Sequence, residues 1–293
     1  MTNCVQCPRK CGADRKNGKT GYCRMPYDAV VAKASLHMWE EPCISGKNGS
    51  GTIFFSGCSL RCVYCQNYEI SHKNFGIRIS EEKLADIMYA LIKKGAHNIN
   101  LVNPTHYSHI IKSVLEKNEF CVPIVYNTSG YERVETLKSL EGLVDIYLTD
   151  FKYYSSKKSK KYSDCDDYFS VVKDAISEMK RQQKNDVFDE YGMMQKGIII
   201  RHLVLPNNLE ETENILSFIK NNFSDNIMVS LMSQYVPCGE AEKFKELSRP
   251  LTSREYEKAA DYLFYSGIEN GFIQEKSSSD EKYIPKFDLE GVK

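Results

Sequence analysis

Three cysteines that could hold a reactive metal centre stand in one short stretch of the chain, at Cys58, Cys62 and Cys65. Their C-x3-C-x2-C spacing allows one loop, directly after a predicted strand, to bring three sulfur atoms together. A four-iron cubane is held by cysteine thiolates, so three cysteines leave one iron without a protein ligand. Because an open coordination position distinguishes a reactive metal site from a closed one, the spacing predicts a 4Fe-4S cluster that binds a further molecule. A three-cysteine zinc site and unligated thiols are the alternatives.

A second group of cysteines lies in a glycine-rich, basic segment without helical or strand periodicity, and it comprises Cys4, Cys7, Cys11 and Cys23. Four thiolates close a tetrahedral site, which suits zinc, and they equally suit a second, fully ligated iron-sulfur cluster. The segment has little apolar surface with which to fold alone, so we expect a bound metal there rather than free thiols. The residues do not decide between zinc and a cluster, or whether Cys43 joins either site.

The composition narrows the classes of partner. The chain has 293 residues, with 39 Lys or Arg and 39 Asp or Glu, so no field of one sign favours nucleic acid or anionic lipid. Its longest apolar runs are strand-sized, and the N-terminus lacks the pattern of an export signal. We therefore expect a cytoplasmic protein with no nucleic acid or membrane partner. Disulfides are rare in the cytosol, which makes metal ligation the leading explanation for eleven cysteines.

The elements that position these cysteines follow from hydrophobic periodicity. From residue 51 onward, short apolar runs alternate with amphipathic stretches, as in repeated strand-helix units around a parallel sheet. Strands are expected near residues 52–56, 98–102, 122–126, 144–148, 197–205 and 227–232. Helices are expected near residues 80–94, 105–116, 132–140, 167–183, 209–221 and 253–270. The pattern predicts an α/β fold, a partial (βα)6 barrel over residues 51–275, with an irregular Cys-rich extension over 1–50 and a polar, loosely ordered tail over 276–293.

The cluster stretch resembles the signature of the radical S-adenosylmethionine (SAM) superfamily, C-x3-C-x-aromatic-C after the first strand, with Tyr64 in the aromatic position. The resemblance implies a partial TIM-like barrel and a cluster whose free iron is chelated by the amino and carboxylate groups of SAM. The reduced cluster would pass one electron to the sulfonium, and the resulting 5'-deoxyadenosyl radical would abstract hydrogen from a substrate. The resemblance also implies an electron donor such as a flavodoxin or ferredoxin.

Polar residues at the carboxyl ends of the predicted strands supply the rest of the expected site, because reactive groups of parallel barrels gather there. These positions resemble those of pyruvate formate-lyase activating enzymes. Ser129 stands in a turn like their Thr-Asn-Gly, Asp150 and Lys152 in a stretch like their Asp-Leu-Lys, and Arg201 in a strand like their Arg-then-Val-Pro. The resemblance implies SAM-side roles for Tyr64, Asn67, Asn103, Asn127, Ser129, Asp150, Lys152 and Arg201, with Lys152 and Arg201 meeting a carboxylate.

Several positions depart from the activating enzymes. Their second strand ends in Gly-Gly-Glu, which holds the SAM amino group, whereas this chain has Asn103-Pro104-Thr105-His106. Asn127 stands where those enzymes carry an acid, and the sixth strand ends without the His that they place near the ribose. We therefore expect amino-group recognition to differ in detail. A scaffold role is the alternative for the Asn and Asp residues, for His106 and for His202, and a solvated role for Lys152, which precedes a lysine-rich run.

The residues and the resemblance together predict reductive SAM cleavage followed by hydrogen abstraction. One hypothesis is an enzyme that installs a glycyl radical on a partner enzyme. The alternative is direct radical chemistry on a small molecule or a peptide. A non-catalytic module with two zinc sites is the third reading.

Overall fold

The fold is built on one curved sheet, and the computed structural model describes residues 3–223, 227–274 and 285–293. The strands follow the order β10-β9-β8-β6-β5-β4-β2-β1-β3, with β7 paired to β8 off this path. Their bounds are β1 Ala29–His37, β2 Ser50–Phe55, β3 Ile77–Ile79, β4 Ile99–Val102, β5 Ile124–Thr128, β6 Ile146–Asp150, β7 Val187–Phe188, β8 Met194–Leu203, β9 Met228–Met232 and β10 Gly271–Ile273.

Parallel pairing runs from β2 through β4, β5, β6, β8 and β9 to β10, so the carboxyl ends of these strands meet at one edge. The pairing is antiparallel where β1 meets both β2 and β3, and between β7 and β8. Within the described residues the sheet is an open path with β10 and β3 at its edges. This arrangement matches the expected partial barrel.

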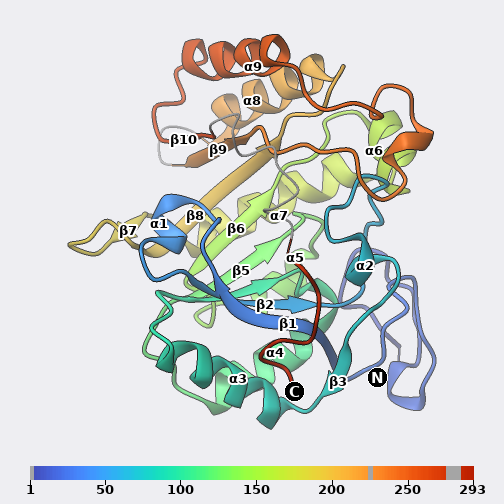
Figure 1. The fold of residues 1–293 in the computed structure, drawn as a ribbon, viewed down its shortest axis with the longest axis vertical. Coiled ribbons are helices and arrows are strands. Elements are labelled where there is room, and N and C mark those ends of the chain that lie inside the picture. Colours follow the sequence, from blue (N-terminus) through green and yellow to red (C-terminus); the bar gives the residue numbers. More distant parts are fainter. Residues whose placement is uncertain (1–2, 224–226, 275–284) are drawn as a thin grey trace.

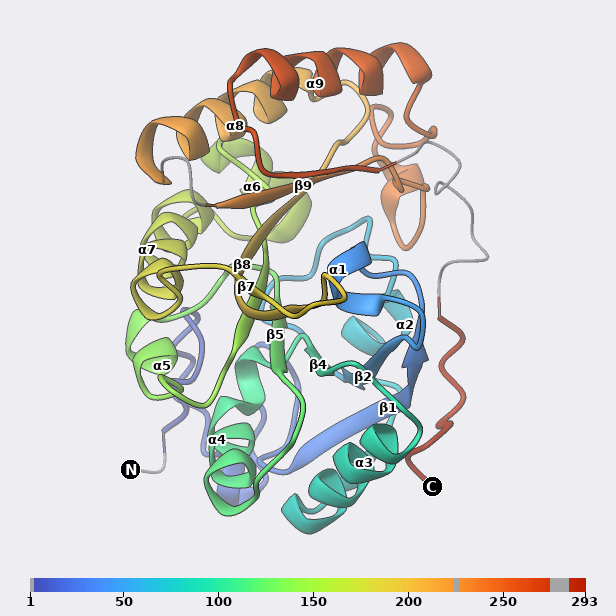
Figure 2. The same cartoon turned by 90° about the vertical axis from the view of Figure 1, so that its left-hand side faces the viewer.

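The longer helices cover the outer, convex face of the sheet, as Figures 1 and 2 show. The helix bounds are α1 Pro42–Ser45, α2 Tyr68–Ser71, α3 Glu81–Lys93, α4 Ser108–Lys117, α5 Val134–Lys138, α6 Ser156–Ser163, α7 Tyr168–Gln182, α8 Leu209–Phe223 and α9 Ser253–Tyr265. The short α1 lies on the inner face, where Ile44 shares a cluster with Val125 and Ile199. Capping fixes where some of them begin. Ser80 Oγ accepts a hydrogen bond from Lys83 N at the start of α3, and Thr252 and Glu255 form a capping box at the start of α9. No helix of the described residues is long and apolar enough to cross a membrane.

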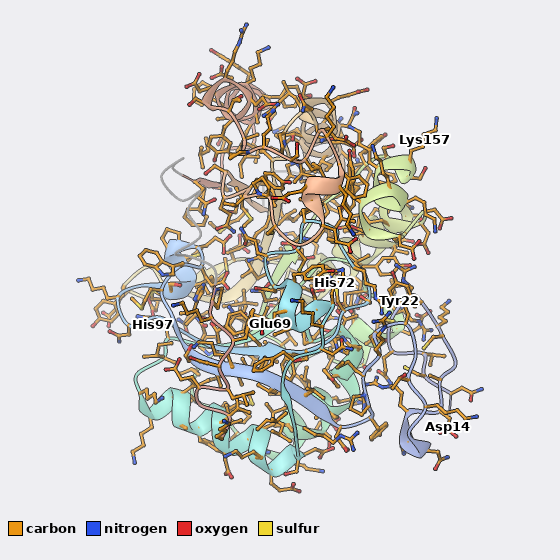
Figure 3. The ribbon with its side chains drawn as sticks, turned by 45° about the vertical axis from the view of Figure 1, so that its right-hand side comes forward. Asp14, Tyr22, Glu69, His72, His97 and Lys157 are labelled. Atoms are coloured by element: carbon orange, nitrogen blue, oxygen red, sulfur yellow. The ribbon has the colours of Figure 1, made fainter. Side chains whose placement is uncertain are left out.

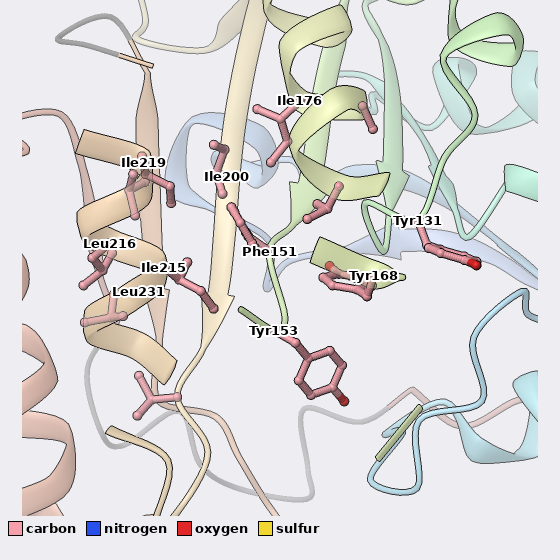
Figure 4. Packing of buried hydrophobic residues seen from close by; sticks show 14 of the residues in the cluster. Tyr131, Phe151, Tyr153, Tyr168, Ile176, Ile200, Ile215, Leu216, Ile219 and Leu231 are labelled. Carbon is pink, nitrogen blue, oxygen red and sulfur yellow. The ribbon is translucent and has the colours of Figure 1, made fainter. Parts of the chain in front are cut away.

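The largest part of the core lies between the sheet and α7 and α8. Ile200 of β8 and Leu231 of β9 pack in one cluster with Ile176 of α7 and Ile215 of α8, all with no exposed surface. Figure 4 shows Phe151, which directly follows β6, among the same side chains. Because the apolar side chains of α7 and α8 bury this face of the sheet, the carboxyl ends of its strands are held in fixed positions.

The structure confirms all six predicted parallel strands and the six predicted helices, with boundaries shifted by a few residues. The expectation that residues 1–50 contain no strand is wrong, because β1 pairs along β2 from His37 to Val31. The sequence pattern also missed β3, β7, β10 and α6. The division of the chain into three segments stays a prediction.

The expectation of a loosely ordered tail is wrong for residues 285–293. Ala34 N of β1 donates to Glu290 O at 2.8 Å, and Leu289 N donates to Ala32 O at 3.0 Å, so this segment pairs with β1 beyond the end of β3. Val292 is buried in the core beneath it. The rest of the predicted tail, residues 276–284, lies outside the described residues.

Candidate cluster and cofactor site

A hollow at the carboxyl ends of the parallel strands gathers the residues that were predicted to act. All three cysteines of the cluster stretch line it, together with every residue expected on the SAM side: Tyr64, Asn67, Asn103, Asn127, Ser129, Asp150, Lys152 and Arg201. These side chains come from β5, β6 and β8 and from the segments that follow β2, β4, β5 and β6. We call this space the first hollow. The roles of its residues stay predictions, but their convergence is a property of the fold.

The cluster stretch begins where β2 ends, at a backbone position that requires glycine. Gly57 has φ +84°, and a Cβ there would lie 2.2 Å from Met25 Cγ. Each sulfur then accepts a hydrogen bond. Leu60 N donates to Cys58 Sγ at 3.3 Å, the Ser163 hydroxyl to Cys62 Sγ at 3.0 Å, and the Ser71 hydroxyl to Cys65 Sγ at 3.2 Å.

The thiols of Cys58 and Cys65 are buried, and burial favours their neutral form. Burial raises the pKa of Cys58 to about 12 and that of Cys65 to about 11, and the neighbouring Cys62 adds to both shifts. Thiolates that are buried beside each other are stabilised by metal ions, which deprotonate a coordinating thiol. With hydroxyl donors on one side of the sulfurs and the first hollow on the other, this donor set fits an iron-sulfur cluster with one open position.

A buried network of charged groups forms the opposite wall of the first hollow. The Arg201 guanidinium donates from Nε to Asp150 Oδ1 at 3.0 Å, from Nη1 to Glu40 Oε2 at 3.1 Å and from Nη2 to Asn127 Oδ1 at 2.6 Å. Lys152 Nζ donates to Asp150 Oδ2 at 2.5 Å. The other oxygen of Glu40 accepts from Asn127 Nδ2 at 3.2 Å. The network holds three polar strand ends in one rigid arrangement.

Burial and charge act against each other in this network. Burial alone would raise the pKa of Asp150, but Lys152 and Arg201 hold it below its usual value. Burial would likewise lower the pKa of Lys152, but the charges of Asp150 and Cys62 raise it. The Lys152 side chain is only 18% exposed, so the solvated alternative for this residue is wrong. Both groups are charged and paired inside the hollow.

The remaining predicted residues connect the cluster stretch to the barrel. Tyr64 OH lies 2.6 Å from Tyr153 OH, which lies 2.7 Å from the Ser163 hydroxyl, so a chain of hydroxyls leads to Cys62. Asn103 adopts φ +58° and donates from Nδ2 to Gly57 O at 2.6 Å.

Ser129 Oγ is buried with no hydrogen-bond partner among the described residues, and Asn67 precedes α2 without a side-chain capping bond. An unpaired buried hydroxyl in such a wall is available to a ligand.

Two histidines have the scaffold role that was their alternative. His106 Nε2 lies 2.7 Å from Ser56 O, and His202 bridges Phe151 O at 2.7 Å and Thr212 Oγ1 at 2.9 Å. Burial lowers the pKa of His106 to about 3 and that of His202 to about 4, so both rings are neutral.

Sequence reasoning missed the segment after β1. Trp39 and Glu40 line the first hollow, and Glu40 stands 161 positions from its partner Arg201. The sequence does show an acidic pair, Glu40-Glu41, directly after an apolar run. Such a pair is ordinary in an exposed turn, and it becomes informative only when the turn is known to be buried. Periodicity does not report burial of a loop, so this pair could not be assigned.

The N-terminal segment contacts the cluster stretch through Arg9 and Tyr22. Arg9 Nε donates to Ser59 O at 2.8 Å, and its guanidinium lies 4.0 Å from the centre of the Tyr22 ring. Figure 3 shows Tyr22 on the same side of the molecule as His72, which follows α2. Cys7 and Cys23 are buried, whereas Cys11 is exposed.

These N-terminal thiols are neighbours in the fold. Burial raises the pKa of Cys7 to about 12, and Cys23 and Cys4 add to the shift. Among the described residues no three thiol, imidazole or carboxylate groups are arranged to hold a single metal ion. The metal at Cys4, Cys7, Cys11 and Cys23 therefore stays a prediction.

Comparison with known proteins gives a family, a sequence relative and two solved structures. Residues 52–219 match the family model of the radical SAM superfamily. An uncharacterized protein of Methanocaldococcus jannaschii is 34% identical over 271 residues, which are 88% of this chain and 73% of that protein.

Two solved structures share the fold. Streptococcus suis SuiB aligns with a TM-score of 0.50 at 14% identity over 77% of this chain, and the FeFe-hydrogenase maturase HydG of Carboxydothermus hydrogenoformans aligns with 0.50 at 15% over 78%. The chain spans 48% of the first and 55% of the second, about half the length of each. At these identities the likeness concerns the fold alone.

Proposed function

The chain belongs to the radical SAM superfamily, an enzyme family that uses a 4Fe-4S cluster and SAM, and on that premise we propose that it abstracts a hydrogen atom from a substrate held beside the first hollow. The observation that carries this proposal is the convergence of three cysteines and the polar ends of the parallel strands on one hollow. When bound, the cluster supplies one electron to the SAM sulfonium, which yields methionine and a 5'-deoxyadenosyl radical that takes one hydrogen atom from the substrate.

The chain's own residues would orient SAM and protect the chemistry. Cys58, Cys62 and Cys65 would hold three irons and leave the fourth facing the hollow. Arg201 and Lys152 are the cations in the wall, and a SAM carboxylate would compete with Asp150 for them. Ser129, with its unpaired buried hydroxyl, would donate or accept at the ribose. The buried network would keep these groups in place without reorganisation.

Activation of a glycyl radical enzyme is the first candidate for the substrate. It is supported by the activating-enzyme-like positions Ser129, Asp150, Lys152 and Arg201, which all line the first hollow. Direct catalysis on a small molecule or peptide is the second candidate. It is favoured by a second hollow that shares a wall with the first, because a volume of about 570 Å³ suits a small molecule.

The proposed chemistry is tested by anaerobic reconstitution with iron and sulfide, followed by reduction in the presence of SAM. We expect a brown protein that releases 5'-deoxyadenosine and methionine in equal amounts. A colourless protein that contains zinc alone and consumes no SAM would overturn the proposal. An electron paramagnetic resonance spectrum after mixing with a glycyl radical enzyme separates the two substrate classes, because only an activating enzyme gives a glycyl radical signal on its partner.

We also propose that the N-terminal cysteines bind a second metal centre. Their support is the proximity of Cys4, Cys7 and Cys23, two of which are buried in a segment with few apolar contacts of its own. Iron and zinc contents per chain, measured after reconstitution with each metal, distinguish a second cluster from a zinc site. A content that does not exceed four irons, with no zinc, would contradict the second centre.

A further inference from the structure

A second hollow opens beside the first, on the side away from the cluster stretch. Its volume is about 570 Å³, within the range of small-molecule sites, and none of the cluster cysteines lines it. The loop after β1 and the ends of β8, β9 and β10 form its walls. Five residues line both hollows: Trp39, Glu40, Arg201, Met232 and Gln234. A ligand in the second hollow would therefore lie against the space where SAM is proposed to bind.

The wall of the second hollow contains a buried carboxylate with an unused oxygen. Glu41 is 8% exposed, and its Oε2 has no hydrogen-bond partner among the described residues. It stands at the N-cap position of α1 but makes no side-chain capping bond. Burial raises the pKa of Glu41, and the positive charge of Arg201 opposes that shift. Ser230 provides a hydrogen bond to the Glu41 side chain, so Oε2 is the oxygen of this carboxylate that is buried without a donor among the described residues.

Glu40, the neighbouring residue, shows what a satisfied carboxylate looks like here. One of its oxygens accepts from Asn100 at 3.1 Å and from Asn127 at 3.2 Å, and the other pairs with Arg201 at 3.1 Å. Arg201 is in turn shared with Asp150. Arg201 thus makes hydrogen bonds to Glu40 and Asp150 and acts on Glu41 through its charge.

Glu41 lines the second hollow and not the first. The carboxylates of Glu40 and Asp150 are hydrogen-bonded to Arg201, whereas the Glu41 Oε2 atom has no partner among the described residues. A positive group in the second hollow would favour the ionised form of Glu41 against the burial that raises its pKa.

The other side chains of the second hollow suit the body of an organic cation. Trp39 is 59% exposed, and it stands in the wall with Met38, Met232 and Phe272. An aromatic ring attracts an ammonium group through its face, and methionine side chains adapt to varied apolar shapes. A hydrated inorganic cation would gain nothing from these groups.

We infer that the second hollow is the substrate site and that it binds a small organic amine, with the ammonium group on Glu41 and the apolar body against Trp39. This inference rests on the proposed function, since the shared wall places the amine beside the radical. It narrows the substrate to a primary amine on an apolar or aromatic body.

The binding test uses reconstituted enzyme with saturating SAM, and phenethylamine as the probe. Isothermal titration calorimetry measures its affinity, and fluorescence of Trp39, the single tryptophan of the chain, reports contact in the hollow. We expect phenethylamine to bind at least tenfold more tightly than 2-phenylethanol, which has the same body and no charge. Equal affinities for the two compounds would overturn the inference without any variant.

The variant Glu41→Gln keeps the shape of the side chain and removes its charge. We expect Glu41→Gln to lose affinity for phenethylamine by tenfold or more. The matched control Glu69→Gln, at an exposed residue, should bind phenethylamine as tightly as the parent chain. Unchanged binding in Glu41→Gln would contradict the role of the Glu41 carboxylate in binding the ammonium group.

Two alternative ligands would also overturn the inference. If Mg²⁺ binds and phenethylamine does not, the site takes a metal ion and the inference is wrong. If saturating SAM abolishes amine binding, Glu41 serves the ammonium of SAM and the inference is again wrong.

The same preparation separates this inference from the proposed function. Release of 5'-deoxyadenosine by the parent enzyme, measured without any amine, tests the radical chemistry alone. Failure of amine binding with intact SAM cleavage would remove only the substrate class. Absence of SAM cleavage in a cluster-loaded enzyme would remove the proposed function itself.

Discussion

The two groups of cysteines are held in place by different kinds of structure. At the cluster stretch, Cys62 and Cys65 accept hydrogen bonds from the hydroxyls of Ser163 and Ser71, and the loop starts directly from β2. In the N-terminal segment, the backbone bonds of Cys4 close on the segment itself, from Cys4 N to Ala13 O and from Gly12 N to Cys4 O, both 3.0 Å. The first group is positioned by other elements of the fold, and Cys4 is positioned by the turns of its own segment.

The difference teaches which group can be reactive. The cluster stretch has the first hollow on its open side and the buried charges of Asp150, Lys152 and Arg201 across from it. The N-terminal segment is instead wrapped around Arg15, whose guanidinium donates to His106 O at 2.6 Å and lies 3.8 Å from Cys4 Sγ. A site that must hold SAM needs space and fixed charges, whereas a site that only fastens a segment needs neither.

The largest effect is expected from removing one ligand at the cluster stretch. Cys62→Ala leaves two thiols for the cluster, so we expect complete loss of its absorbance and of SAM cleavage. Cys121→Ala, at an exposed cysteine, is the matched control and should retain both. If Cys62→Ala released measurable 5'-deoxyadenosine, the assignment of the reactive centre to the cluster stretch would be wrong.

The corresponding change in the N-terminal segment should act on stability. Cys7 is buried, and metal binding by such a segment is part of its folding free energy. We expect Cys7→Ala to lower the free energy of unfolding of the loaded protein by more than about 3 kcal/mol while SAM cleavage per reactive cluster continues. Urea titration and metal analysis measure the two effects. Loss of SAM cleavage at unchanged cluster content would mean that the N-terminal group takes part in the reaction.

The connection between the two groups can be tested at Arg9. Its side chain donates to Ser59 O and to Asp164 O, both at 2.8 Å, so it ties the N-terminal segment to the cluster stretch. We expect Arg9→Ala to cost about 2 kcal/mol in urea unfolding, since each bond is made by a charged donor. The exposed Lys19→Ala should stay within about 0.5 kcal/mol of the parent chain. Equal effects of the two changes would show that the segments are not coupled through Arg9.

The smallest effect is expected at a hydroxyl that contacts a cluster sulfur. Ser163→Ala removes the donor at 3.0 Å from Cys62 Sγ. A hydrogen bond to sulfur stabilises the reduced, more negative cluster, so its loss should lower the midpoint potential, at a cost of about 1 kcal/mol. Potentiometric titration measures the shift, and Ser170→Ala, on the exposed side of α7, is the control. A potential that rises or stays constant in Ser163→Ala would contradict this role.

The parallel strands could be predicted because burial on both faces demands uninterrupted apolar residues. Ile198 to Ile200 is such a run, and it lies inside β8, which pairs with a parallel strand on each side. Because parallel strands end at one edge, the meeting of Asp150 with Arg201 could also be anticipated. β1 was missed because glycine-rich stretches flank it. Averaged over the whole segment, these glycines hide the apolar pattern of the strand.

Other features depend on contacts between distant segments. Glu40 enters the site only because β1 folds back antiparallel to β2, which no local pattern reports. α6 was taken for a solvated lysine run because its buried residues, Ser159, Tyr162 and Ser163, carry little apolar signal. One of them, Ser163, proves to contact Cys62. Sequence therefore located the groups that do chemistry better than the groups that orient them.

The pairing of residues 285–293 with β1 bears on how copies of the protein behave toward one another. β3 covers only the first residues of β1, from Ala29 to Val31, and the next ones would otherwise present free N–H and C=O groups. Leu289 and Glu290 occupy those groups, and Lys33 pairs with Asp288 at 3.1 Å beside them. An uncovered strand of this kind recruits strands from other molecules. Residues 285–293 cover this stretch of β1, and we expect a chain that ends before residue 285 to self-associate more than the parent chain does.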